Sequence, residues 1–151
     1  MSRMTENDIL FGDIEWYGID KKGNVAVFCN AGKASVPEFI CENKERAEHL
    51  VDLFEKMPFI LNTKLCFTPC EKNRRKEVAE EFSNKGLYYY DSDDCSEINY
   101  CILQTYYTIN SVPTNPIKFD DLPFKIQELI QFNKVNVDDF ANVKTIDVTI
   151  Y

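Results

Sequence analysis

The chain has 151 residues, of which 44% are hydrophobic and 28% charged, and its formal net charge at pH 7 is −8. This length predicts a single globular domain over residues 1–151. The acidic balance counts against direct binding to nucleic acid or to an anionic membrane surface, since both require a basic footprint. No apolar run has the length of a signal peptide or a membrane span, so a cytoplasmic location is expected.

The charge is concentrated in the second half of the chain. Residues 1–85 carry 13 basic and 15 acidic side chains, whereas residues 86–151 carry 4 basic and 10 acidic ones. An acidic surface in the second half would attract a basic partner, although a net negative charge also serves solubility alone. The six cysteines and the single histidine, His49, match no zinc pattern, so we expect reduced thiols, no metal and no cofactor.

Residues 13–30 predict a β-hairpin. Ile14 and Trp16 alternate with Glu15 and Tyr17, as in a strand with two different faces. Asp20-Lys21-Lys22-Gly23 has the composition of a hairpin turn, in which Gly23 takes a positive φ. The returning strand, 25–29, is apolar on both faces, which is typical of a strand inside a sheet.

The loop that follows, Asn30–Ser35, contains Gly32 and leads to Pro37. A glycine loop after a strand is reminiscent of a phosphate site, but the Gly-x-Gly-x-x-Gly spacing and the Gly-Lys-Ser/Thr ending are missing. We therefore expect a structural loop here. The residues before it, 1–7, are polar and are expected to fray, and residues 9–11 are expected to form a turn of helix or a lead-in.

Two helices are predicted in the middle of the chain. The first begins at the N-cap Asn43 and ends before Pro58. The second begins at a capping box, Thr68–Glu71, and ends near Gly86, its left-handed C-cap. Its first turn would hold Cys70, where a helix dipole makes a thiol more reactive, although a small residue under the cap explains the same position. The basic run over 72–76 is interpreted as a solvated face rather than as an anion site.

The remaining elements are mostly strands. Residues 87–90 and 98–109 predict two antiparallel strands joined by an acidic tip, 91–97, which lacks the glycine of a calcium loop. Residues 112–116 predict a loop, Asp120 or Asp121 caps a third helix with Pro123 in its first turn, and residues 145–150 predict a last strand. Hairpins rather than strict strand–helix alternation favour an α+β fold, with an antiparallel or mixed sheet and about three helices packed mainly on one face.

Three segments resemble, in order and spacing, a group of small bacterial proteins. They are Trp16-Tyr17-Gly18-Ile19-Asp20-x-x-Gly23-x-Val25-Ala26-x-Phe28 with Gly32 and Pro37, then Gly86-Leu87-Tyr88-x-Tyr90-Asp91, then Pro113-x-x-Pro116-Ile117-x-Phe119-x-Asp121-Leu122-Pro123. The resemblance implies a bacterial, cytosolic protein without an assigned activity, and some of the group resemble immunity proteins that accompany secreted toxins. It assigns no catalytic residue. Cys29 stands where the group has Ser or Thr, so a role for that hydroxyl does not carry over.

The leading hypothesis from the sequence is a non-enzymatic protein-binding module, in its narrower form an immunity-type inhibitor of a basic toxin domain. No nucleophile–base pair has convincing spacing, and an acidic inhibitor associates rapidly with a basic target. The expected contact residues are exposed acids and one tyrosine of the second half: Tyr89, Asp91, Asp93, Asp94 and Glu97. The structural motif residues are Trp16, Asp20, Gly23, Gly32 and Pro37.

Two alternatives stay open at this point. In the first, the chain is an enzyme or a small-ligand-binding domain that uses the Asn30–Ser35 loop, with Cys29, Cys70, His49 or the scattered carboxylates as the reactive groups. In the second, it is a structural subunit of a larger assembly. The sequence does not determine the oligomeric state.

Overall fold

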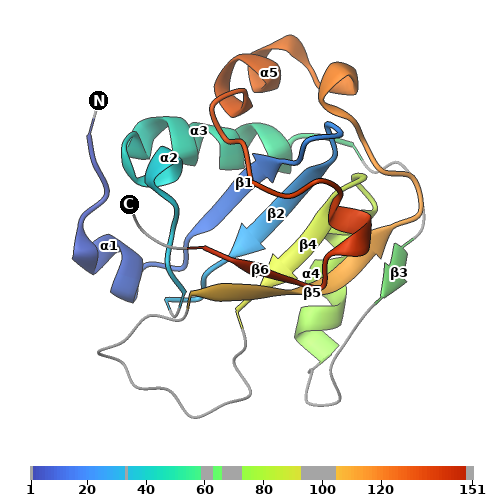
Figure 1. The fold of residues 1–151 in the computed structure, drawn as a ribbon, viewed down its shortest axis with the longest axis horizontal. Helices are drawn as coiled ribbons and strands as arrows, with labels where there is room; N and C mark the ends of the chain where they lie inside the picture. The colour runs from blue at the N-terminus through green and yellow to red at the C-terminus, as the bar shows by residue number, and fades with distance from the viewer. Residues whose placement is uncertain (1, 33, 59–62, 66–72, 93–104, 149–151) are drawn as a thin grey trace.

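The structure is a computed structural model that describes residues 2–32, 34–58, 63–65, 73–92 and 105–148. This part of the chain forms a mixed sheet in the order β1-β2-β4-β5-β3, with β6 also paired to β5 (Figure 1). The strands are β1 (Glu15–Ile19), β2 (Val25–Cys29), β3 (Thr63–Leu65), β4 (Tyr88–Asp91), β5 (Tyr106–Pro113) and β6 (Thr145–Asp147). The predicted α+β fold is confirmed.

The predicted hairpin is formed by β1 and β2, which pair antiparallel with Glu15 opposite Cys29 and Ile19 opposite Val25. Its turn is held by Asp20, whose carboxylate accepts from the backbone N–H of Lys22 at 2.9 Å and of Asn24 at 2.8 Å. Gly23 has a φ of 83°, a backbone conformation that would be strained in a residue with a side chain. The second strand lies inside the sheet, as predicted, because β4 pairs with its other edge.

The β2–β4 pairing is parallel, while β4 and β5 are antiparallel neighbours, as predicted. The described strand β5 starts at Tyr106, and residues 98–104 of the predicted strand lie outside the described residues. β5 continues to Pro113, where it pairs with β3, so the prediction of an irregular loop from residue 112 is wrong at its start. Proline is tolerated there because it stands at the last position of its strand. The β4–β5 register shifts between Tyr89 and Tyr90, which is the mark of a β-bulge.

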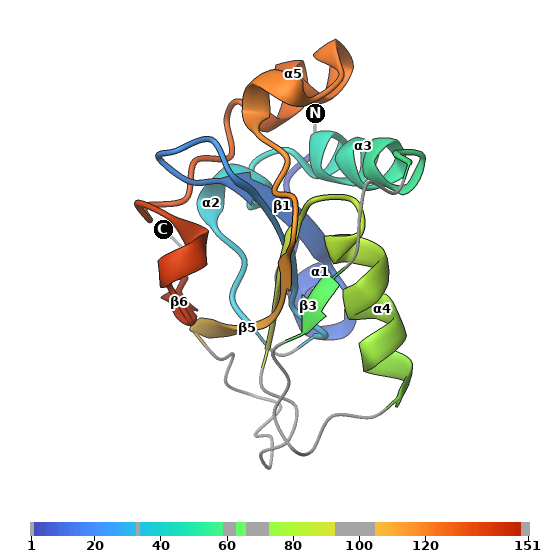
Figure 2. The same cartoon turned by 90° about the vertical axis from the view of Figure 1, so that its right-hand side faces the viewer.

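Five α-helices are described: α1 (Glu6–Phe11), α2 (Glu38–Cys41), α3 (Lys44–Glu55), α4 (Asn73–Ser83) and α5 (Phe124–Ile130). Asn43 caps α3, since its side chain accepts from the N–H of Arg46 at 3.0 Å. Gly86, with a φ of 86°, follows the end of α4 as expected. Figure 2 shows α3 and α4 together on one side of the sheet, with α2 and β6 on the other.

The sheet separates two hydrophobic cores, because successive residues of a strand point to opposite faces. On one face, Trp16 stacks on Phe28 with their ring centroids 3.9 Å apart. On the same face, the hydroxyl of Tyr107 donates a hydrogen bond to the carbonyl of Ser35 at 2.7 Å. On the other face, Tyr17 stacks on Phe54 of α3 at 4.0 Å. That second core takes its helical residues from α3, α4 and α5: Leu50, Phe54, Ala79, Ile126 and Ile130. The expected placement of three helices on one face is confirmed.

Residues 2–7 are held in place, so the expectation that the N-terminus frays is wrong for them, while Met1 lies outside the described residues. The backbone N–H of Met4 donates to the carbonyl of Cys41 at 2.9 Å, and its side chain is buried. Arg3 forms an ion pair with Glu38 in α2. These contacts fix the polypeptide that leads into α1, a helix begun by a capping box between Thr5 and Asp8.

The third predicted helix starts later than expected. Asp120 and Asp121 belong to a separate 3₁₀ turn, η1 (Phe119–Asp121), and Pro123 is the N-cap of α5. Leu122 ends the turn with extended backbone, as expected for a residue that precedes proline. Predictions that lie outside the described residues are the capping box Thr68–Glu71, Cys70, and the acidic tip beyond Ser92.

Candidate functional site: an acidic groove between α1 and α3

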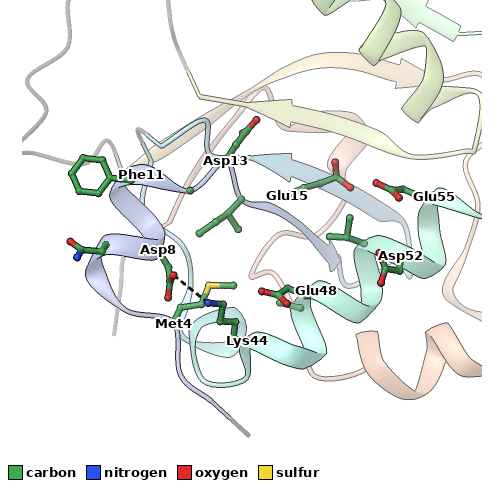
Figure 3. Close-up of a pocket in the computed structure, with 14 residues that line it drawn as sticks. Met4, Asp8, Phe11, Asp13, Glu15, Lys44, Glu48, Asp52 and Glu55 are labelled. Atoms are coloured by element: carbon green, nitrogen blue, oxygen red, sulfur yellow. Dashed lines mark hydrogen bonds and ion pairs between the residues drawn. The ribbon is translucent and has the colours of Figure 1, made fainter.

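A groove with a volume of about 810 Å³ lies between α1, the residues that lead into β1, and α3 (Figure 3). Its charged lining consists of six carboxylates and one ammonium group: Asp8, Asp13, Glu15, Glu48, Asp52, Glu55 and Lys44. These groups give a formal charge of −5. The apolar part of the lining comes from Met4, Phe11, Ile14, Ala47 and Val51.

One wall of the groove is the exposed face of α3. Glu48, Asp52 and Glu55 follow one another at intervals of four and three residues, which places them on one side of a helix. All three side chains are exposed, whereas Leu50 and Phe54 on the inner side are buried in the second core. The amphipathic pattern that anchors α3 to the sheet therefore also lines up its acids along the groove.

Asp8 stands at the α1 end of the groove and is the carboxylate that the protein itself neutralises. It accepts from the backbone N–H of Thr5 at 2.7 Å and from the ammonium of Lys44 at 3.3 Å. The hydrogen bonds from Thr5, assisted by Lys44, hold the pKa of Asp8 below its ordinary value. The single lysine of the groove is therefore already paired.

Glu15 lies at the other end, on β1, and faces Glu55 of α3 across the groove (Figure 3). Partial burial is the main reason why the pKa of Glu15 is raised, and the charges of Glu55 and Asp13 raise it further. The hydroxyl of Tyr17 donates a hydrogen bond to this carboxylate, which works in the opposite direction. The positive charge of Lys85, whose ammonium donates to the backbone carbonyl of Glu55 at 3.2 Å, also lowers the pKa of Glu15. Two acids thus approach each other without forming an ion pair within the described residues.

Some acids elsewhere on the surface are paired with bases, whereas others, such as Asp121 and Glu128, form no ion pair within the described residues. Lys21 contacts Asp138 at 3.3 Å, and Arg46 contacts Glu42 at 3.1 Å. Within the described residues, five carboxylates of the groove likewise form no ion pair: Asp13, Glu15, Glu48, Asp52 and Glu55. The groove therefore concentrates negative charge next to apolar side chains, an arrangement suited to a cationic group with an apolar part.

The structure places the predicted contact residues differently from the expectation. Tyr89 and Asp91 are 2% and 8% exposed, and the hydroxyl of Tyr89 donates to the Asp91 carboxylate. The expectation that these two side chains are exposed is wrong, because β4 is an inner strand and their face of it packs against the helices. Asp93, Asp94 and Glu97 lie outside the described residues, and a role of any of the five in binding stays a prediction.

The residues of the hairpin motif serve the fold. Trp16 is buried and donates from Nε1 to the hydroxyl of Tyr107 at 3.1 Å. Asp20, besides holding its turn, accepts from the backbone N–H of Phe140 at 2.8 Å and so ties the hairpin to the C-terminal segment. Gly32, with a φ of 70°, follows Asn30 in its loop, and Pro37 is the N-cap of α2.

In the Asn30–Ser35 loop, the polar side chain of Asn30 is not available to bind a ligand. The buried Asn30 amide donates to the carbonyls of Ile9 and Ala34 and accepts from the N–H groups of Ile14 and Gly32. All four of its hydrogen-bonding positions are therefore used inside the protein. This loop is structural, as far as the described residues extend.

Of the three Cys and His residues considered as reactive groups from the sequence, the structure describes Cys29 and His49. Burial is the main reason why the pKa of the Cys29 thiol is raised, and the charges of Asp91 and Glu15 raise it further. An activated cysteine has a lowered pKa instead. His49 is exposed on α3, and Cys70 lies outside the described residues. Among the residues that the structure describes, no group of three or more His, Cys, Asp or Glu side chains is placed to hold a metal ion. No described helix is long and apolar enough to cross a membrane.

Sequence reasoning missed the groove because its walls come from separate elements. The acids of α3 are recognisable as one helix face, but Glu15 joins them because β1 packs against α3, and Asp8 because α1 is placed where Lys44 of α3 reaches it. All lining residues lie between 4 and 55, in the half of the chain with the smaller net charge. Local charge geometry, rather than the charge balance of each half, identifies this site.

Comparisons with protein-family models, with characterised proteins and with solved structures gave no match to this chain.

Proposed function

We propose that this chain is a non-enzymatic protein-binding module, and that the groove between α1 and α3 binds a basic segment of a partner protein. The observation that carries the proposal is the set of five carboxylates that form no ion pair within the described residues and surround one cavity of about 810 Å³. Like charges held close together repel each other, and a cationic partner relieves that repulsion on binding.

The groove also supports a protein partner rather than a simple ion. Phe11 lines it and is 81% exposed, the largest exposure among the large hydrophobic residues described. Partly buried Ile14 and Val51 add apolar surface. An apolar centre with a charged rim is the usual anatomy of a protein interface, in which aromatic side chains act as anchors.

In its narrower form, the proposal is that the partner is a basic toxin domain and that this chain is its immunity-type inhibitor in the bacterial cytoplasm. The net charge of −8 and the resemblance of the hairpin motif support this form. An acidic inhibitor of a basic target associates rapidly, because opposite fields steer the encounter.

The proposal is tested by co-purification of the tagged chain with the products of neighbouring genes, followed by titration of any partner so identified. The groove variant is E48Q/D52N/E55Q, and the matched control is E77Q/E81Q/E128Q, which removes three exposed acids away from the groove. We expect at least a tenfold loss of affinity in the groove variant and less than a twofold change in the control. A partner that binds both variants equally would contradict the proposal, as would the absence of any partner among several neighbouring products.

A further inference from the structure

We infer that the segment bound in the groove is a basic α-helix of the partner, lying along the exposed face of α3. This inference rests on the proposed function and specifies the shape of the partner. It follows from the pattern on α3, where Glu48, Val51, Asp52 and Glu55 occupy positions i, i+3, i+4 and i+7 and all line the groove. One partly buried apolar residue is thus framed by three exposed acids.

The axial spacing of these acids fits a helical partner. At a rise of about 1.5 Å per residue, Glu48 and Asp52 are about 6 Å apart along the axis, and Glu48 and Glu55 about 10.5 Å. Basic residues at i, i+4 and i+7 of a second helix have the same rises. On an extended strand, three successive side chains of one face span about 13.6 Å, so a third basic group would pass beyond Glu55.

The other walls of the groove complete a seat for such a helix. Ile14 precedes β1, the edge strand of the sheet, and Glu15, the first residue of β1, faces Glu55 from the opposite wall (Figure 3). An apolar residue at i+3 of the bound helix would contact Val51 and Ile14, while its basic residues meet the acids of α3. This is the helix-in-groove mode of recognition, with charge complementarity added to apolar anchors.

The buried edge of β1 argues against the other common mode, in which an extended peptide adds to a sheet. Along this edge Ile19 already exchanges backbone hydrogen bonds with Asn133 and Val135, at 2.9 and 2.8 Å. The carbonyl of Tyr17 accepts from the side chain of Asn133 at 2.9 Å. The part of the edge from the Tyr17 carbonyl to Ile19 is therefore occupied by the protein's own chain, which limits the length of strand that a partner could add.

The test uses three alanine-based peptides of the same length, titrated calorimetrically into the full chain. The first has Lys at i, i+4 and i+7 and Leu at i+3. The second has the same composition with Lys and Leu at alternate positions, and the third is the first with a central proline that breaks its helix. We expect the first peptide to bind at least tenfold more tightly than the other two. The variant E48Q/D52N/E55Q should remove that preference, and E77Q/E81Q/E128Q should keep it.

The outcomes separate this inference from the proposed function. If all three peptides bind equally and all require the three α3 acids, the groove binds basic segments but the helical partner is wrong. If the peptides bind and the groove variant binds them as well as the wild type does, both the inference and the proposed function are contradicted. If no peptide binds, the helical partner is overturned, while co-purification with neighbouring products still decides the proposed function.

Discussion

Carboxylates at the hairpin turn and in the groove between α1 and α3 have opposite environments. Asp20 is 6% exposed, and its oxygens accept hydrogen bonds from Lys22, Asn24 and the distant Phe140. The groove acids Glu48, Asp52 and Glu55 are exposed and have no ion-pair partner within the described part of the chain. A buried, fully bonded carboxylate stabilises a fold, whereas grouped, unpaired carboxylates cost stability unless a partner uses them.

The sharpest test of this contrast is Asp20→Ala. The substitution leaves buried N–H groups in the hairpin turn and at Phe140 without an acceptor, so we expect a loss of about 3 kcal/mol in the free energy of unfolding. Urea denaturation measures the change. Asp20→Asn keeps the shape and one acceptor oxygen, and it should lose less. Equal stability of Asp20→Ala and the wild type would contradict the structural role of this residue.

A smaller loss is expected for Tyr107→Phe. The Tyr107 hydroxyl accepts from Trp16 Nε1 at 3.1 Å and donates to the Ser35 carbonyl at 2.7 Å, so its removal leaves both groups unpaired in the core. We expect about 1–2 kcal/mol of destabilisation in the same denaturation assay, since the ring itself still packs. Tyr106→Phe, a partly exposed neighbour, is the matched control and should change the stability by less than about 0.5 kcal/mol.

Glu15→Gln tests the groove through its pH dependence. The pKa of Glu15 is raised in the folded protein, so the protonated side chain favours folding. This contribution to stability is present below the ordinary glutamate pKa of 4.5 and is lost as the pH rises through the raised pKa. The glutamine variant keeps an acceptor for Tyr17 but has no charge to desolvate. We expect it to be more stable than the wild type at pH 7, with the difference shrinking at pH 4. A difference that grows as the pH falls would contradict the assigned environment.

The smallest effect on stability is expected for E48Q/D52N/E55Q. Removing like charges from one helix face relieves repulsion, so the variant should match the wild type or exceed it by less than about 1 kcal/mol at low salt. Thermal unfolding at two ionic strengths measures this, and any gain should fade in high salt. A clear destabilisation would mean that these acids support the fold, which would remove the reason to assign them to binding.

Much of the fold could be predicted from the sequence because the patterns that indicate its elements are local. Alternation around Trp16, the turn at Asp20–Gly23 and the cap at Asn43 each act within a few residues, and each appears where predicted. The errors have tertiary causes. Residues 2–4 are ordered by contacts with α2 and α3, and η1 precedes α5 because Pro123 keeps Leu122 extended.

The candidate site was far harder to predict from the sequence. Asp91 begins an acidic run in the sequence, yet it is the last residue of β4 and shares a row across the sheet with Cys29 and Glu15. Nothing local shows that helices cover that row. The groove likewise depends on how β1 packs against α3 and on where α1 is placed, which a single sequence does not encode in any short segment.

The most direct test of the account is a chemical-shift map of the ¹⁵N-labelled chain during titration with the peptide that has Lys at i, i+4 and i+7. We expect the largest shifts at the backbone amides of Glu15, Glu48, Val51, Asp52 and Glu55, and their disappearance in E48Q/D52N/E55Q. Shifts centred instead on acids far from the groove, such as Asp120, Glu128 and Asp138, would contradict the claim that the groove between α1 and α3 is the binding surface.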